Sequence, residues 1–317
     1  MAKKILIKNA TIINEEKKFI SDLLIVDTKI FEIKTNIKIQ DDFEIIDATG
    51  KVLIPGLIDD QVHFREPGLT HKATIKSESK AAIAGGITSF IEMPNTIPQT
   101  TTVKELKRKF KIAEASSYAN YSFMFGATNS NLEEIKKIDK NEVAALKIFL
   151  GSSTGNMLVD DQDILRDIFL NTDLIIVVHS EDEQIINENL EKHKLKYGSN
   201  IPFEFHSKIR SEEACLKSTK KIIKLAKETN ARLHVFHLST KSESLLFDNS
   251  MPLKDKKITS EVCVHHLWFS DNDYKNKQSL IKWNPSIKTS EDRNGIWDAL
   301  LNDKIDVIAT DHAPHTI

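Results

Sequence analysis

The chain has 317 residues, of which 40% are hydrophobic and 28% are charged, and its formal net charge is −2. A chain of this length can bury a large core, and its balanced charge speaks against partners held mainly by electrostatic attraction, such as nucleic acid or a membrane surface. Its two cysteines give no disulfide framework, and we find no signal peptide and no apolar stretch of membrane-spanning length. We therefore expect a cytoplasmic protein.

The first 53 residues are predicted to form a small β-domain. Apolar and polar residues alternate over short runs, turns such as "NEEKK" separate the runs, and no helical period intervenes. The runs are "KILIKNATIIN", "DLLIVDTKIFEIK" and "FEIIDATGKVLI".

Residues 54–317 follow a different rhythm, in which apolar runs typical of buried strands alternate with segments of helical spacing. Helical segments such as "TVKELKRKFKIAEAS" and "SEEACLKSTKKIIKLAKE" separate most of these runs. Eight strands alternating with helices predict an α/β fold, a (β/α)8 barrel. The eight runs are "LIPGLID", "GITSFIEMP", "YSFMFGAT", "VAALKIFL", "LIIVVHS", "RLHVFHLS", "ITSEVCVH" and "IDVIATD".

Polar side chains occur in or just after six of the eight runs. In a (β/α)8 barrel the chemistry lies at the carboxyl ends of the strands, so side chains from several strand ends can meet there. Side-chain packing alone would hardly place polar residues at matching positions on six strands. The residues are Gln61, His63 and Arg65 after the first run, Asn95 after the second, Lys147 in the fourth, His179 in the fifth, His237 in the sixth and Asp311 in the eighth.

The histidines at these strand ends favour a metal site, because neutral imidazole is the commonest transition-metal ligand. His234 and His237 lie three residues apart, so they face opposite ways on a strand; we favour His237 because it lies nearer the strand end. His265 and His266 are adjacent on an expected strand, so their side chains should diverge, and we expect a metal role for neither.

Lys147 and Asp311 each have an ordinary alternative. Lys147 is either a lysine whose ammonium reaches solvent, or a buried amine with a lowered pKa that can add carbon dioxide and bridge two metal ions as a carbamate. Asp311 is either a cap or turn residue, or a metal ligand and general base.

The order of the motifs resembles that of the dihydroorotases, within the metal-dependent amidohydrolase superfamily. The resemblance runs from about residue 50 to the last residue, and "HFREPG", "MPNT" and "DHAPHT" separate dihydroorotases from most related cyclic amidases. The matching motifs are "DDQVHFREPG", "EMPNT", the lysine of "ALKIFL", "VVHSE", "HVFHLS", "WNPSIK" and "ATDHAPHT".

The resemblance implies a two-metal site, usually filled by zinc. His63 and Asp311 would hold the first ion, His179 and His237 would hold the second, and Lys147, carboxylated by carbon dioxide, would bridge them. A metal-bound hydroxide would attack the cyclic amide, with Asp311 as general base and then acid.

The resemblance also implies a substrate, N-carbamoyl-L-aspartate, which would cyclise reversibly to dihydroorotate in pyrimidine biosynthesis. Arg65, Asn95, Asn284 and His315 match substrate contacts, and the guanidinium of Arg65 suits a carboxylate. Glu261 matches an acidic position that binds an additional metal in some relatives, and we treat it as structural.

Gln61 departs from the family pattern, which has histidine at this position. An amide oxygen is a weaker zinc ligand than imidazole, so three outcomes stay open: Gln61 coordinates weakly, water fills the position, or the first ion is lost. The other functional positions of this stretch are intact, which favours an active variant.

Two other functions remain as alternatives. One is a hydantoinase-like or allantoinase-like cyclic amidase, against which Arg65 and Asn95 speak. The other is a non-catalytic homologue that serves as a structural partner of aspartate transcarbamoylase, with Gln61 as its only support. The resemblance leaves open a homodimer and an association with aspartate transcarbamoylase.

The chain stops at "TDHAPHTI", a few residues after the expected eighth strand. The family pattern normally continues with a further helix, a substrate loop and strands that complete the N-terminal β-domain, an incomplete sandwich here. We therefore expect a fragment of a longer protein, with unpaired strand edges.

Overall fold

The computed structural model describes residues 3–151 and 156–316. Contacts between residues divide the chain into two compact units, Met1–Leu57 and Ile58–Ile317. Along the described chain, no helix is both long enough and apolar enough to cross a membrane.

The smaller unit is a five-stranded sheet. Its strands are β1 (Lys4–Asn14), β2 (Lys17–Val26), β3 (Lys29–Lys34), β4 (Phe43–Asp47) and β5 (Val52–Leu53). β1 pairs antiparallel with β2 and parallel with β4 and β5, and β3 pairs antiparallel with β2. The β1–β2 hairpin turns through Glu15 and Glu16, with φ angles of 47° and 62°. Two positive φ angles are typical of the type I′ turn, whose twist matches that of the flanking strands.

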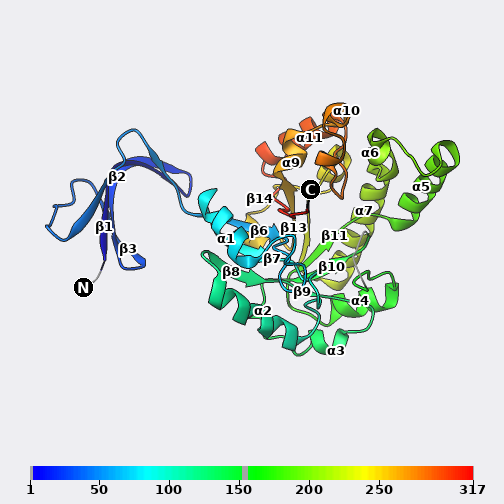
Figure 1. Ribbon diagram of the computed structural model, residues 1–317, viewed down its shortest axis with the longest axis horizontal. Coiled ribbons are helices and arrows are strands. Elements are labelled where there is room, and N and C mark those ends of the chain that lie inside the picture. The colour runs from blue at the N-terminus through cyan, green and yellow to red at the C-terminus, as the bar shows by residue number, and fades with distance from the viewer. Residues whose placement is uncertain (1–2, 152–155, 317) are drawn as a thin grey trace. The chain divides into compact units, whose positions relative to one another are not determined.

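The larger unit is a ring of parallel strands with its helices on the outside (Figure 1). Its strands are β6 (Leu57–Val62), β7 (Ile87–Glu92), β8 (Asn120–Phe123), β9 (Phe125–Gly126), β10 (Leu146–Phe149), β11 (Ile176–His179), β12 (Leu233–Val235), β13 (Ile258–Cys263) and β14 (Val307–Ala309). One sheet holds β6 to β8 and a second holds β9 to β14, both in chain order. A bridge between Val62 and His312 joins β6 to the segment after β14. Because β8 and β9 continue one run, the eight predicted strands and the (β/α)8 barrel are confirmed.

Helices follow most of these strands, and the longer ones begin at a capping side chain. Thr74, Asp161 and Ser211, for example, accept a hydrogen bond from a backbone N–H in the first turn of α1, α4 and α7, which stabilises a helix start by about 1 kcal/mol. The helices are α1 (Ile75–Ala84), α2 (Val103–Ser116), α3 (Leu132–Ile135), α4 (Gln162–Leu170), α5 (Glu183–Tyr197), α6 (His206–Ile209), α7 (Glu212–Thr229), α8 (Lys241–Ser244), α9 (Val264–Trp268), α10 (Tyr274–Lys277) and α11 (Ser290–Leu301). The part of the chain that the structure describes also contains the 3-10 helices η1 (Phe203–Phe205), η2 (Leu253–Asp255), η3 (Asp271–Asp273) and η4 (Gln278–Ile281).

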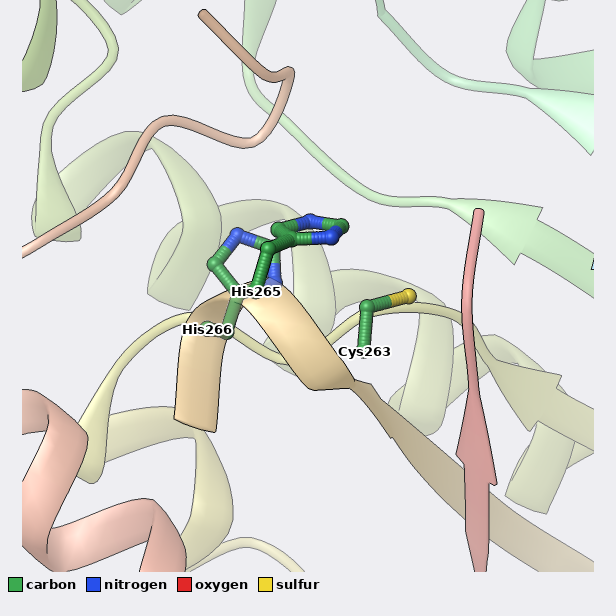
Figure 2. Close-up of side chains that lie close together, drawn as sticks. All are labelled: Cys263, His265 and His266. Atoms are coloured by element: carbon green, nitrogen blue, oxygen red, sulfur yellow. The ribbon is translucent and has the colours of Figure 1, made fainter. Parts of the chain in front are cut away.

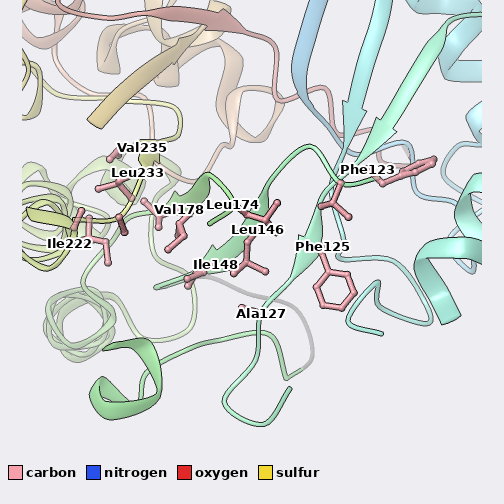
Figure 3. Packing of buried hydrophobic residues seen from close by; sticks show 14 of the residues in the cluster. Phe123, Phe125, Ala127, Leu146, Ile148, Leu174, Val178, Ile222, Leu233 and Val235 are labelled. Atoms are coloured by element: carbon pink, nitrogen blue, oxygen red, sulfur yellow. The ribbon is translucent and has the colours of Figure 1, made fainter. Parts of the chain in front are cut away.

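Two separate apolar clusters reflect the alternation of side chains along the barrel strands. Leu146 and Ile148 of β10 belong to the larger cluster, with Val178 of β11 and Ile222 of α7 (Figure 3). A smaller cluster holds Met93, Met124, Ala145, Val177 and Phe236. Since Lys147 lies between Leu146 and Ile148, its side chain points away from the helices, toward the inside of the ring.

One local prediction was wrong. The segment with His265 and His266 is not a strand, because β13 ends at Cys263 and α9 begins at Val264. On this helical turn the two rings do not diverge: their centroids lie 4.3 Å apart, and both residues are buried.

Candidate functional site

His63 and Asp311 meet at the carboxyl ends of β6 and β14. His63 Nε2 lies 3.1 Å from Asp311 Oδ1, and His63 Nδ1 lies 2.8 Å from Asn95 Oδ1. Burial by itself raises the pKa of Asp311. The hydrogen bond and the charge of His63 outweigh burial and hold this pKa below its ordinary value. The Asn95 amide thus fixes the imidazole of His63 so that Nε2 faces the carboxylate.

His179 and His237 form a second pair, at the ends of β11 and β12. His179 Nδ1 lies 3.1 Å from His237 Nε2, and the residues are 4% and 2% exposed. Burial lowers the pKa of both imidazoles, so both are neutral at physiological pH. Within the described residues, His237 Nδ1 is a buried nitrogen without a hydrogen-bond partner.

An ion pair behind His179 was not predicted from the sequence. Glu181 Oε2 lies 2.7 Å from His179 Nε2, and Arg210 makes a salt bridge to the same carboxylate. Burial by itself raises the pKa of Glu181. The charge of Arg210 and the contact with His179 outweigh burial and hold this pKa far below its ordinary value. The arrangement directs His179 Nδ1 toward His237. Glu181 follows His179 by two residues in "VVHSE", and that spacing was the available signal.

Lys147 lies inside the barrel and is 1% exposed. Its Nζ lies 3.9 Å from the ring centroid of Phe236 and 4.9 Å from that of Phe149. Burial lowers the pKa of Lys147 to about 7, although the negative charges of Glu261 and Asp311 oppose the shift. A large fraction of this amine is therefore neutral and nucleophilic near pH 7.

Three of the predicted site residues have an unusual backbone conformation. The φ angles of Arg65, His237 and Asp311 are 69°, 39° and 48°. Left-handed backbone costs a non-glycine residue free energy and persists where the surrounding structure imposes it, often at functional sites. All three residues follow the end of a strand, where this turn redirects the side chain.

Arg65, Asn95 and His315 line a single cavity of about 590 Å³. Arg65 Nε donates to the carbonyl of Pro314 at 3.0 Å, and Arg65 Nη2 lies 3.1 Å from His315 Nε2. Lys72, which the sequence did not single out, lines the same cavity, and its Nζ lies 3.3 Å from His315 Nδ1. A cavity with a guanidinium and an ammonium on its wall suits a small anion.

Asn284 lies elsewhere. It lines a separate hollow of about 340 Å³ with His206, Arg210 and Lys282. Because Arg210 also contacts Glu181, this hollow borders the His179 side of the site.

Gln61 is buried inside the barrel and contacts a cysteine. Its side chain is 1% exposed, and Cys263 Sγ donates to its Oε1 at 3.4 Å. Burial, followed by the charges of Glu261 and Asp311, raises the pKa of the Cys263 thiol well above its ordinary value.

Glu261 is a fully buried carboxylate below this contact. Its Oε1 accepts a hydrogen bond from the backbone N–H of His237 at 3.3 Å, and its Oε2 lies 3.2 Å from His234 Nε2. Asp60 Oδ2 lies 3.8 Å from the same His234 nitrogen. His234 thus faces two carboxylates and not the His179–His237 pair.

The amino-acid pattern of the family model described as "Amidohydrolase family" matches residues 52–317. The chain belongs to the amidohydrolase family.

Curated relatives of this amidohydrolase carry the name dihydroorotase. The protein of Methanosarcina acetivorans is 32% identical over 98% of this chain and 67% of its own length. The protein of Bacillus cereus is 33% identical over 98% of this chain and 72% of its own length. That of Ehrlichia chaffeensis is 36% identical over 86% of this chain and 60% of its own length. These similarities confirm the predicted resemblance to dihydroorotases.

Solved structures with the same fold include other cyclic-amide hydrolases. The L-hydantoinase of Arthrobacter aurescens superposes with a TM-score of 0.91 at 26% identity, over 99% of this amidohydrolase and 70% of that chain. The dihydropyrimidinase of Brevibacillus agri gives a TM-score of 0.88 at 24% identity, over 99% and 69% of the two chains, which shows the fold alone.

The site residues of this amidohydrolase fit divalent metal ions. Two ligand nitrogens on one tetrahedral zinc ion lie about 3.4 Å apart, and a nitrogen and a carboxylate oxygen do so as well. The His179–His237 and His63–Asp311 distances, both 3.1 Å, are close to this value. His237 also keeps one buried ring nitrogen, Nδ1, that has no hydrogen-bond partner in the described part of the chain. Its imidazole is therefore not fully hydrogen-bonded by the protein.

Proposed function

We propose that this protein is a dihydroorotase, which interconverts dihydroorotate and N-carbamoyl-L-aspartate. The observation that carries the proposal is the juxtaposition of two candidate ligand pairs with a cationic cavity. Asn95 connects the two regions, because it lines the cavity with Arg65 and its Oδ1 lies 2.8 Å from His63 Nδ1. The dihydroorotases among the curated relatives support the same conclusion.

We assign the metal ligands in two groups. His63 and Asp311 would hold one ion, His179 and His237 would hold the other, and Lys147 would supply a carbamate as a further ligand once its neutral amine has added carbon dioxide and released a proton. The pKa of Lys147, about 7, supports this step because the neutral amine is the species that reacts. We propose zinc, which accepts imidazole and carboxylate ligands together.

The residues of the chain divide the remaining work. The bound ions would supply Lewis-acid activation of water and of the amide carbonyl. Asp311 accepts the proton of the attacking water and transfers it to the ring nitrogen as the carbon–nitrogen bond breaks. Glu181 and Asn95 orient His179 and His63, and Arg65 holds the substrate carboxylate by two parallel hydrogen bonds. Ring closure is the reverse of these steps and releases the water.

A second candidate, a hydantoinase-like activity, is favoured by the fold similarity to L-hydantoinase. Dihydroorotate differs from dihydrouracil by one carboxylate, and Arg65 and Lys72 on the cavity wall favour the substrate that carries it.

The test is a comparison of kcat/KM for dihydroorotate and for dihydrouracil on the zinc-loaded chain. We expect a clear preference for dihydroorotate, and Arg65→Lys should remove about 10 to 100-fold of that preference, because one ammonium cannot replace the two parallel contacts. Turnover of dihydrouracil should not change in this variant. An enzyme that prefers dihydrouracil, or an Arg65→Lys variant with unchanged preference, would contradict the proposal.

A further inference from the structure

Cys263 and Gln61 meet inside the barrel although they belong to different strands. Cys263 is the last residue of β13, and Gln61 is the fifth residue of β6. Both are buried, and the sulfur lies 3.4 Å from the amide oxygen. This contact falls at the position that the dihydroorotase pattern fills with a histidine.

The strand register places the contact directly below the His63–Asp311 pair. Cys263 pairs with Ala309 of β14, and Asp311 follows Ala309 by two residues. Gln61 precedes His63 by two residues on β6, so their side chains share one face. The sulfur and the amide therefore extend the same interior face that ends in the His63–Asp311 pair.

The sulfur-to-oxygen distance suits two ligands of one ion. A thiolate at about 2.3 Å and an oxygen at about 2.1 Å from a tetrahedral zinc ion lie about 3.6 Å apart. The distance between Cys263 Sγ and Gln61 Oε1 is 3.4 Å. A cation between the two side chains would replace a weak S–H···O contact with two coordinate bonds.

A second feature beside Cys263 also indicates a ligand. The donor atoms of Cys263, His265 and His266 all lie within 4.8 Å of one another, where β13 passes into α9 (Figure 2). His265 is 5% exposed, and its Nε2 has no hydrogen-bond partner among residues 3–151 and 156–316. His265 also lines one cavity with Asp311. Next to Cys263, a buried nitrogen therefore remains without a hydrogen-bond partner within the described chain, on a residue that shares a cavity with Asp311.

We propose that Cys263 is a thiolate ligand of the ion held by His63 and Asp311, in place of the histidine that the family pattern has at residue 61. Gln61 then positions the sulfur or shares the ion through its amide oxygen. Binding of the ion breaks the S–H bond and releases the proton to solvent, while the sulfur keeps the electron pair that forms the bond to the metal. The inference rests on the metal centre of the proposed function.

The test uses the whole chain loaded with cobalt(II). Thiolate bound to cobalt(II) gives a strong charge-transfer absorption in the near ultraviolet, which nitrogen and oxygen ligands lack. We expect this band in the wild-type chain and its loss in Cys263→Ala. The matched control is Cys215→Ala, because Cys215 is the other buried cysteine and its Sγ lies 3.7 Å from Ser239 Oγ; this variant should keep the band.

A double variant separates loss of the ligand from damage to the fold. Gln61→His combined with Cys263→Ala should recover the cobalt content that Cys263→Ala loses, without the charge-transfer band. A wild-type chain without the band, or a band that survives in Cys263→Ala, would overturn the inference. A double variant that recovers no cobalt would also contradict it.

Dihydroorotate turnover, measured separately on the zinc-loaded wild type, distinguishes the two failures. Turnover without the band contradicts the role of Cys263 and leaves the proposed function in place. The band without turnover contradicts the proposed function and leaves the ligand in place.

Discussion

The half of the site around His179 and His237 differs from the half around His63 and Asp311 in where its support comes from. His179 is held by Glu181, two residues further along the chain, and Glu181 is held by Arg210. On the other half, Gln61 meets a cysteine 202 positions away. The carboxylate that contacts His179 thus comes from two residues further along the chain, whereas the partner of Gln61 reaches it only through the closure of the barrel.

Lys147→Ala should have the largest effect of the variants, because the proposed carbamate serves both halves of the site. We expect kcat for dihydroorotate to fall by about 10³-fold or more, since the variant loses a ligand of both ions. Added acetate or propionate should restore part of kcat by taking the place of the carbamate. The measurement is kcat with and without the short carboxylate.

The control for this variant is Lys109→Ala. Lys109 is also fully buried, but it makes a salt bridge to Glu92 and donates to the carbonyl of Met93 on the helix side of the barrel. Its loss should lower Tm, and acetate should not restore activity. Equal rescue of both variants, or of neither, would count against the bridging role.

Glu181→Gln tests the half in which a carboxylate two residues away holds His179. The amide keeps the shape of the side chain but loses the charge that holds His179 and pairs with Arg210. Loss of such an orienting carboxylate typically weakens metal binding by about 10 to 100-fold. Zinc titration should show one weakened site, while KM for dihydroorotate changes little. Weakening of both sites would mean that the halves are not independent.

Gln61→His tests the half that depends on barrel closure. The new imidazole should tighten the first ion by about 10-fold, because it is a better zinc ligand than an amide. The zinc concentration needed for half-maximal activity is the measurement. If neither this concentration nor the metal content changes, residue 61 does not face the ion.

Glu243→Gln has the smallest expected effect and concerns the polar support behind His179. Glu243 accepts hydrogen bonds from Thr219 and Thr240, and Thr219 Oγ1 also lies 3.0 Å from the hydroxyl of Ser180, next to His179. Burial raises the pKa of Glu243 from 4.5 to about 7. The native protein therefore binds this proton more tightly than the unfolded chain, and its contribution to stability is lost as pH rises from 4.5 to 7.

The slope that Glu243 adds in this window is about −1.4 kcal/mol of unfolding free energy per pH unit. Glu243→Gln should remove that slope, which urea unfolding at several pH values measures. A variant with the same pH dependence as the wild type would show that Glu243 is ionised in the native protein throughout.

The alternation of strands and helices allowed the barrel and the gathering of polar side chains at its strand ends to be predicted. The resemblance to dihydroorotases, and not the geometry, implied which of these side chains form the two candidate pairs. The sequence left open whether the ammonium of Lys147 reaches solvent or is buried, and only the structure shows that the residue is buried. His237 was favoured over His234 because it lies nearer the strand end. The contact of Gln61 with Cys263 could not be predicted, because it depends on the register of β6, β13 and β14 together. The α9 turn was missed because "VHHLWF" is apolar enough for a strand, and periodicity does not distinguish a short helix from a strand.

The metal content of the chain, purified without chelator, is the sharpest test of the proposed two-metal centre. We predict two ions per chain by elemental analysis, one ion in His237→Ala and one ion in His63→Ala, with each variant still folded by circular dichroism. Less than one ion per wild-type chain, or a content that neither substitution changes, would contradict it.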